Sequence, residues 1–309
     1  MRYYHMCLSC NDEIMFRTDE DYRRAINCLV LAAYKTESSI LAYAFMSTHL
    51  HLCIKTDNPY KMMTIYRYAY TRYFNRKYRR QGKLGEVHPF VIELDGLYHI
   101  LTAICYVLRN PLHHGVSETA FGYPYSSIQV YFRKAMGKDN IQDAKILSPR
   151  HHSRHLPHHT IKPEKYRMNE QGTYIMSDFV SHLEVEHMFV TARSFCFYMN
   201  RISSEEWMKE QEKDQNGKDK ISLQRIEDGV THNSLSDMLK NEYGKSNYKK
   251  ISDIELCTLI DRSLPSDSSV YTISDRTKEK IYRDMIKAHR SDHIQTLRCL
   301  SLPVAKYKF

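Results

Sequence analysis

Two histidines separated by a single residue are the first candidates for chemistry in this sequence. His49 and His51 flank Leu50 within an apolar segment, Ile40 to Ile54, that has the length of a strand hairpin. Alternate side chains of a strand share one face. Both imidazoles therefore point the same way and can bind one divalent metal ion. The alternative is that they are two partly buried histidines of an ordinary strand, because a His-x-His motif is short.

A tyrosine and an asparagine near the end of a predicted helix are the second candidates. Tyr106 and Asn110 are four residues apart, so they lie on one helix face. Pro111 disfavours helical continuation at Asn110, and Gly115 suits the turn beyond it. We therefore expect the helix to end near Arg109. A strand with two metal ligands, followed by a helix that offers a phenol and an amide oxygen, is a specific combination.

A basic, aromatic-rich helix over about residues 60–80 is the third candidate. Residues 60–83 contain eight Lys or Arg residues and six tyrosines, but no Asp or Glu. A surface of this kind neutralises phosphates and stacks unpaired bases. The alternative is a solvated cationic face whose tyrosines pack on the sheet. The arginines that fall along one stripe, and that we predict to bind DNA, are Arg72, Arg76, Arg79 and Arg80.

A small α+β domain is expected to position these residues. The patterns predict strands at 2–10, 40–46, 49–55 and 87–94, and helices at 19–35, 60–80 and 97–109. The order βαββαβα favours a ferredoxin-like antiparallel sheet with helices packed on it. We assign residues 1–130 to this domain and 131–176 to a polar connector.

Residues 177–309 are predicted to form a mainly helical C-terminal region. Its last two helices, 278–289 and 291–300, are separated by a short break that is similar to a helix-turn-helix over about 278–301. In that interpretation Arg290, His293, Gln295 and Arg298 face DNA. A small helical bundle without a role in DNA binding is the alternative.

Taken together, the motifs resemble those of the single-tyrosine HUH transposases, and most closely the REP-associated tyrosine transposase branch. That family has a metal-binding His-hydrophobe-His strand and a later helix with Tyr-Ile/Val-x-x-Asn-Pro, usually followed by a turn with Gly. The match covers roughly residues 1–130. The matching positions are His49, Leu50, His51, Tyr106, Val107, Asn110, Pro111 and Gly115, with similar segments at Tyr73-Phe74-Asn75 and Gly122-Tyr123-Pro124.

The resemblance implies an HUH fold and a DNA transposase that cleaves and rejoins single-stranded DNA through a metal-assisted 5′-phosphotyrosine intermediate. It assigns Tyr106 as the nucleophile and His49 and His51 as metal ligands. Asn110 is the expected third ligand, because its amide oxygen suits Mg²⁺ or Mn²⁺. The implied partner is single-stranded or hairpin DNA, and relatives occur as dimers and monomers, which leaves a homodimer open. All catalytic matches precede Ser127, so we expect residues beyond about 145 to be dispensable for the chemistry.

Composition agrees with a nucleic-acid partner without identifying it. The net charge of +9 over 309 residues favours a polyanion but does not separate RNA from DNA. The sequence contains no apolar run long enough for a membrane span, lacks a signal-peptide core and has eight scattered cysteines, so we expect a cytoplasmic protein. Two other functions remain open: a non-catalytic nucleic-acid-binding regulator on an HUH scaffold, and an RNA-binding protein.

Overall fold

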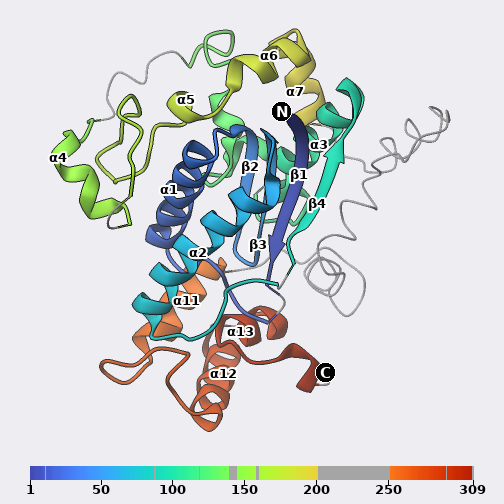
Figure 1. Ribbon diagram of the computed structural model, residues 1–309. Helices are drawn as coiled ribbons and strands as arrows, with labels where there is room; N and C mark the ends of the chain where they lie inside the picture. Colours follow the sequence, from blue (N-terminus) through green and yellow to red (C-terminus); the bar gives the residue numbers. More distant parts are fainter. Residues whose placement is uncertain are drawn as a thin grey trace.

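The chain folds around a four-stranded antiparallel sheet with helices on both faces, as seen in the computed structural model (Figure 1). The structure describes residues 1–10, 12–86, 88–117, 119–138, 145–157, 160–200, 251–289 and 291–307. The sheet and its helices are β1 (Arg2–Ser9), α1 (Asp19–Lys35), β2 (Ser39–Met46), β3 (His49–Thr56), α2 (Pro59–Tyr78), β4 (Phe90–Leu94) and α3 (Gly96–His113). This α+β arrangement confirms the predicted fold class.

The strand order β2-β3-β1-β4 makes β3 an inner strand, paired with β2 on one side and with β1 on the other. Together with the chain order βαββαβα, this is a ferredoxin-like layout. Strand β4 starts later than predicted, at Phe90, whereas the other strand boundaries lie within a residue of those predicted. Because helices cover both faces of the sheet, β3 buries side chains on both of its faces.

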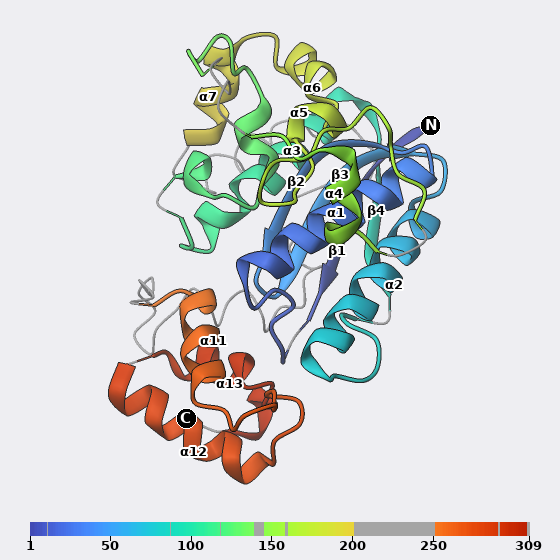
Figure 2. The same cartoon turned by 90° about the vertical axis from the view of Figure 1, so that its left-hand side faces the viewer.

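Helices α1 and α2 cover one face of the sheet and α3 covers the other (Figures 1 and 2). Leu50 of β3 lies opposite Phe45 of β2, and the Phe45 ring is 6.3 Å from the ring of Tyr66 in α2. The neighbouring residue His51 therefore points to the other face, where its ring lies 5.1 Å from that of Tyr106 in α3. The period-2 alternation of a strand thus separates an apolar core layer from a histidine-bearing layer.

Local capping signals set the ends of the two helices on the core face. Thr18 caps α1 and forms a capping box with Asp21, as expected where acidic residues open a helix. Asn58 caps α2, with Pro59 at its first position. Helix α2 stops at Tyr78 because Arg79 takes a left-handed conformation, with φ of 52°.

Helix α3 continues through Pro111 to His113, so the predicted end near Arg109 is wrong. A proline in a helix removes one backbone donor, but the following residues keep their bonds. The His114 N–H donates to the Asn110 carbonyl oxygen, and the Val116 N–H donates to that of Pro111. Asn110 is therefore held in a helical turn, directly one turn after Tyr106.

The chain after residue 130 packs against the same core as the sheet. Two short 3₁₀ turns come before this part of the chain, η1 (Ala120–Gly122) and η2 (Ser127–Val130). The short elements after residue 130 are α4 (Pro149–His152), η3 (Ser153–His155), α5 (Met176–Phe179), α6 (His182–Phe189) and α7 (Ala192–Asn200). Val180 forms a parallel bridge with Ile40 of β2, and Phe179 and Phe195 belong to the hydrophobic core of the sheet. The predicted boundaries at 130 and 176 remain predictions, and this core crosses both of them.

The last part of the chain forms a separate helical cluster, α11 (Asp253–Arg262), α12 (Asp275–His289), α13 (His293–Cys299) and η4 (Val304–Lys306). Its apolar side chains surround Ile260 and Leu297, and Ile14 of the sheet domain joins them. The predicted helical character of this region is confirmed. Residues 201–250 lie outside the described residues. None of the helices in the described segments is long and apolar enough to cross a membrane.

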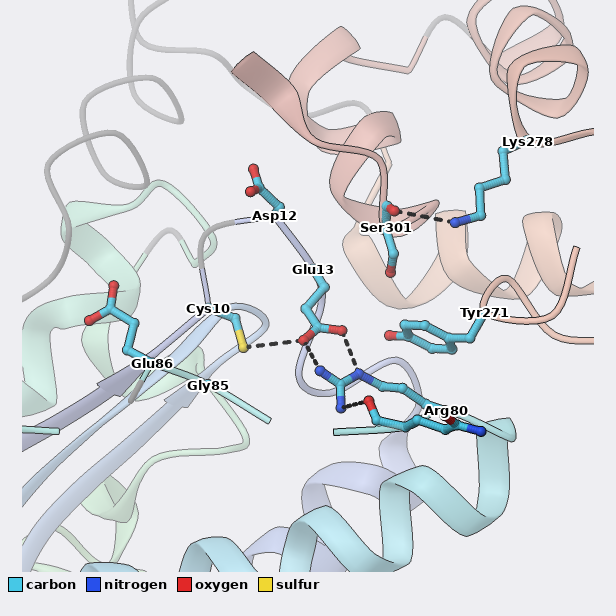
Figure 3. Close-up of a pocket in the computed structure, with 10 residues that line it drawn as sticks. Cys10, Asp12, Glu13, Arg80, Gly85, Glu86, Tyr271, Lys278 and Ser301 are labelled. Carbon is cyan, nitrogen blue, oxygen red and sulfur yellow. Dashed lines mark hydrogen bonds and ion pairs between the residues drawn. The ribbon is translucent and has the colours of Figure 1, made fainter. Parts of the chain in front are cut away.

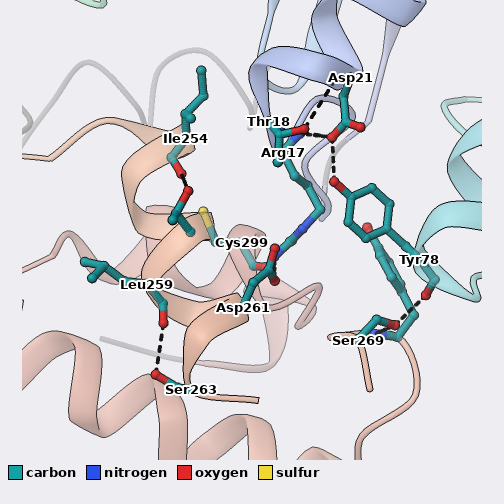
Figure 4. A network of polar contacts seen from close by, with 12 residues as sticks. Arg17, Thr18, Asp21, Tyr78, Ile254, Leu259, Asp261, Ser263, Ser269 and Cys299 are labelled. Carbon is teal, nitrogen blue, oxygen red and sulfur yellow. Dashed lines mark hydrogen bonds and ion pairs between the residues drawn. The ribbon is translucent and has the colours of Figure 1, made fainter. Parts of the chain in front are cut away.

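A buried arginine fastens this cluster to the sheet domain (Figure 4). Arg17 is fully buried; its guanidinium donates to the Cys299 carbonyl oxygen at 2.6 Å and to Asp261 Oδ1 at 2.8 Å. Ser269 also donates to the carbonyl oxygen of Tyr78, at the end of α2. Because Arg17 is fully buried, loss of Asp261 would leave a buried charge without its carboxylate partner, which is destabilising. The C-terminal helices are therefore an integral part of the fold.

Candidate active site

The four residues predicted to act together do meet, between β3 and α3. His49 and His51 project from β3 toward α3, and their rings are 5.0 Å apart. Tyr106 and Asn110 face them from consecutive turns of the helix. All four side chains are buried, with at most 3% of each residue exposed. The strand period and the helix period placed each pair on one face, and packing of α3 on the sheet brought the two pairs together.

His49 is held on both sides of its ring. Its Nε2 lies 3.1 Å from Asn110 Oδ1, and its Nδ1 lies 3.1 Å from the hydroxyl of Thr48. The consistent assignment is that Nε2–H donates to the amide oxygen while Nδ1 accepts from the threonine hydroxyl. The His49 ring orientation is thus fixed by one neighbour in the chain and by one residue of α3.

His51 is oriented by a third histidine, His5 of β1, which the sequence analysis missed. His5 Nε2 lies 3.1 Å from His51 Nδ1, and the two rings stack with centroids 5.3 Å apart. The other nitrogen of the ring, His51 Nε2, is buried and meets no hydrogen-bond partner within the described chain. The alternation in β1 showed which face His5 takes, but only strand pairing places it beside His51.

Burial keeps these imidazoles neutral at physiological pH. Desolvation lowers the pKa of His49 to about 4; the bond with Asn110 opposes this shift, and the positive charge of Arg298 adds to it. Desolvation alone lowers the pKa of His5 to about 3, and burial with the neighbouring histidines lowers that of His51 well below 6.5. A neutral imidazole keeps a nitrogen lone pair, which is the form that binds a metal ion.

These shifts predict a marked loss of stability in acid. Between about pH 6.5 and pH 4 the unfolded chain binds protons at His5 and His49 that the folded chain does not bind, so stability falls as pH falls. From pH 7 to pH 5 each of the two should cost about 2 kcal/mol of unfolding free energy. Urea unfolding in EDTA at both pH values measures this. His5→Gln should reduce the loss by about 2 kcal/mol, and His88→Gln on the exposed surface is the control that keeps the buried histidines; an equal pH dependence in all three proteins would contradict the assignment.

The donor atoms of the cluster fit a divalent metal ion. His49 Nε2 and Asn110 Oδ1 are 3.1 Å apart, close to the roughly 3 Å between adjacent oxygen-type ligands of an octahedral ion held at about 2.1 Å. Binding an ion through Nε2 would require the other His49 tautomer, in which Nδ1–H donates to the Thr48 hydroxyl. His51 Nε2 is buried and meets no hydrogen-bond partner among the described residues, and His5 and Thr48 orient the rings from behind, as outer-shell residues of metal sites do. Across the described residues, no group of three or more His, Cys, Asp and Glu side chains is arranged to hold a metal. A metal at this site would therefore rely on the Asn110 oxygen.

The four predicted DNA-binding arginines separate into two pairs. Arg72 and Arg76 are exposed on α2, and the Arg72 guanidinium lies over the ring of Tyr68. Arg79 donates to the carbonyl oxygen of Asp267, and Arg80 forms a two-bond ion pair with Glu13. Because α2 lies on the core face of the sheet, the exposed pair is on the opposite side of the sheet from the histidine cluster.

The Arg80–Glu13 pair forms one wall of a cleft of about 540 Å³ between the sheet domain and the C-terminal helices (Figure 3). Lys278 and Tyr271 of the C-terminal cluster line its other side. Arg80 is thus paired with a carboxylate of the protein itself. These surroundings do not support the prediction that Arg80 binds DNA.

Two of the three described residues that the predicted helix-turn-helix would turn toward DNA are buried. Helices α12 and α13 exist, but Gln295 and Arg298 are only 3% exposed and face the interior of the protein. His293 is exposed, and the hydroxyl of Tyr282 lies 2.6 Å from its Nδ1. Arg290 lies outside the described residues. The DNA-facing roles assigned to Gln295 and Arg298 are wrong, because the apolar side of α13 packs inward and carries both residues with it.

Comparisons with known proteins add little to this geometry. No family model matches the sequence, and no curated protein matches it. Among solved structures, the chain is similar to one described as a REP-associated tyrosine transposase bound to a REP hairpin. The two are 11% identical with a TM-score of 0.36, and the similarity covers 44% of this chain and 78% of that chain. With so low a TM-score, this similarity does not support a conclusion about the function of the chain.

Proposed function

We propose that this protein is a DNA transposase of the HUH type, which cleaves and rejoins single-stranded or hairpin DNA through a covalent link to Tyr106. The observation that carries the proposal is the meeting of Tyr106 and Asn110 with His49 and His51, where the His51 Nε2 atom is buried and oriented but has no described partner. A set of two neutral imidazoles, an amide oxygen and a phenol suits phosphoryl transfer better than it suits core packing.

In the proposed reaction the Tyr106 oxygen attacks the phosphorus of a DNA phosphodiester. A bond forms between that oxygen and phosphorus, the bond from phosphorus to the 3′ oxygen breaks, the phenol loses its proton to solvent, and the 3′ oxygen takes up a proton. A divalent ion such as Mg²⁺ or Mn²⁺, when bound, would polarise a phosphate oxygen and stabilise the developing charge. The phosphodiester energy is kept in the tyrosine ester, so the strand can be rejoined without ATP.

One observation favours a second candidate, a nucleic-acid-binding regulator on the same scaffold. Tyr106 is 3% exposed, so a DNA phosphate reaches its hydroxyl only after the surroundings open. The exposed arginines Arg72 and Arg76 lie on the other face of the sheet. A protein that binds nucleic acid through α2 without turnover has the same features.

A cleavage assay on oligonucleotides separates these functions. The full-length protein is incubated with labelled single-stranded DNA, hairpin DNA or RNA, with Mg²⁺, with Mn²⁺ or with EDTA, and the products are resolved on a denaturing gel. A transposase gives an upstream fragment that ends in a 3′-hydroxyl and a downstream fragment whose 5′ phosphate is linked to the protein, from DNA and only when metal is present. Binding without cleavage under every condition supports the regulator, and adducts on RNA alone would redirect the proposal to RNA.

Binding through the exposed face of α2 should depend on two arginines. Replacing Arg72 and Arg76 together by Ala is expected to reduce the slope of log K against log salt by about 1.4 for single-stranded DNA, because each lost phosphate contact removes about 0.7. Fluorescence anisotropy across a salt series measures the slope. Arg80→Ala is the matched control: because Arg80 is paired with Glu13, it should leave the slope unchanged. If the slope changes only in Arg80→Ala, the DNA binds at the cleft and not on α2.

A further inference from the structure

The outer side of α2 carries two tyrosines that packing does not explain. Four of the six tyrosines in residues 60–83 contribute to the fold, and they are Tyr66, Tyr70, Tyr73 and Tyr78. Three of these are buried, and the fourth, Tyr73, donates from its hydroxyl to Asp21 at 2.9 Å. The other two are open to solvent, with 60% of Tyr60 and 65% of Tyr68 exposed. The alternative that the tyrosines of this helix pack on the sheet therefore accounts for four of them and leaves two.

The two exposed tyrosines belong to one ridge of the helix. Side chains four residues apart form a continuous ridge along a helix surface. The ridge that starts at the beginning of α2 is exposed at every position, and its members are Tyr60, Thr64, Tyr68, Arg72 and Arg76. The Arg72 guanidinium lies 5.6 Å from the centroid of the Tyr68 ring, and this attraction between a cation and an aromatic face orients the ring. Two aromatic rings are thus followed by two cations along one exposed line.

The charges of this ridge are open to an external anion. Helix α2 contains no Asp or Glu, and Arg72 and Arg76 form no ion pair with any residue that the structure describes. Two carboxylates that flank the helix in sequence or in space are already paired: Glu20 lies 2.8 Å from Lys77, and Asp57 lies 2.9 Å from the N-terminal ammonium. The chemistry of the ridge is therefore complementary to a polyanion that also offers flat apolar faces.

A single strand of nucleic acid has both properties. Its phosphates are charged, and its unpaired bases can stack on aromatic side chains, which is how proteins without sequence preference bind such strands. In a duplex the bases are already paired and stacked on each other, so a duplex offers the ridge its phosphates alone. Exposed aromatic rings beside guanidinium groups therefore favour the single strand over the duplex.

We propose that Tyr60 and Tyr68 stack on unpaired bases of a DNA strand whose phosphates are bound by Arg72 and Arg76. This inference rests on the proposed function for the kind of partner, and it adds a base-binding site to it. A helix rises about 1.5 Å per residue, so the two tyrosines are about 12 Å apart along the axis and stack on two different bases. Because α2 covers the core face of the sheet, the strand held there is a different part of the DNA from the phosphate that Tyr106 attacks (Figures 1 and 2).

A strand with bases and a strand without them separate stacking from charge. The full-length protein is titrated in EDTA, at one salt concentration, into a labelled normal strand and into a strand of equal length made of abasic nucleotides, and fluorescence anisotropy gives both affinities. Tyr68→Ala should weaken binding of the normal strand by about 5-fold or more and leave the abasic strand unchanged. Tyr60→Ala should act in the same direction. Tyr68→Phe keeps the ring, so it should bind both strands as the wild-type protein does.

The control variant is Tyr98→Ala, which removes a tyrosine of α3 that is 43% exposed; it should change neither affinity. The slope of log K against log salt should stay at its wild-type value in Tyr68→Ala, because no charge is removed. An equal loss on both strands, no loss on the normal strand, or a Tyr68→Phe variant as weak as Tyr68→Ala overturns the stacking role.

The outcome is distinguishable from a failure of the proposed function, since EDTA prevents metal-dependent cleavage and the affinities do not depend on an adduct. If the wild-type protein shows the expected difference between the strands but forms no adduct with Mg²⁺ or Mn²⁺, the proposed chemistry fails and the stacking site stands. A wild-type protein that binds neither strand refutes both.

Discussion

Tyr106→Phe is expected to abolish the covalent protein–DNA adduct while leaving DNA binding and metal binding in place. The change removes one hydroxyl and keeps the ring that packs 5.1 Å from His51 and 5.9 Å from His5. The fold should therefore tolerate it, and the loss should be complete because phenylalanine has no nucleophilic oxygen. The adduct is measured on a denaturing protein gel with a labelled DNA strand.

The chain contains 24 tyrosines, so the position of the adduct is the sharper measurement. Mass spectrometry of the digested wild-type adduct should place the nucleotide on the peptide that contains Tyr106. Tyr98→Phe is the matched control, because Tyr98 lies two turns earlier in α3 and is 43% exposed; it should retain the adduct. A nucleotide on any tyrosine other than Tyr106 would refute the assignment, and an adduct of Tyr106→Phe would do the same.

His49→Ala and His51→Ala are expected to have the second largest effect, the loss of metal-dependent cleavage. Each removes one of the two imidazole nitrogens that would bind the ion, and the stabilisation that a catalytic metal provides amounts to several kcal/mol, or about 1,000-fold in rate. The arginines of α2 lie on the opposite face of the sheet, so single-stranded DNA affinity should change little.

Two readouts separate a metal role from a structural one. Titration calorimetry or Mn²⁺ electron paramagnetic resonance should detect one bound ion in the wild-type protein and none in the variants. Circular dichroism should show that the variants remain folded, and the surface variant His88→Ala should bind metal and cleave normally. Cleavage in EDTA by the double variant, or unchanged Mn²⁺ binding, would exclude the proposed ligands.

The amino-acid sequence by itself determined the arrangement inside each element. His49 and His51 share a face because a strand repeats every two residues, and Tyr106 and Asn110 share a face because a helix repeats about every 3.6. Helix α1 begins and ends where its acidic start and apolar spacing predicted. These features depend on near neighbours in the chain, so composition and spacing reveal them. Pro111 led to a wrong prediction only of where α3 ends. The helix continues past it, and the Pro111 carbonyl oxygen still accepts a hydrogen bond.

Only the tertiary structure decided which elements face each other and which charges become partners. His5 orients His51 because β1 pairs with β3 in one register. Arg80 lies with Glu13 rather than along an open stripe, and Arg298 lies inside the protein rather than on a DNA-facing helix. Each of these outcomes joins residues far apart in sequence. The free energy that selects them comes from burying apolar surface and pairing charges across the whole fold, and no local periodicity encodes that choice.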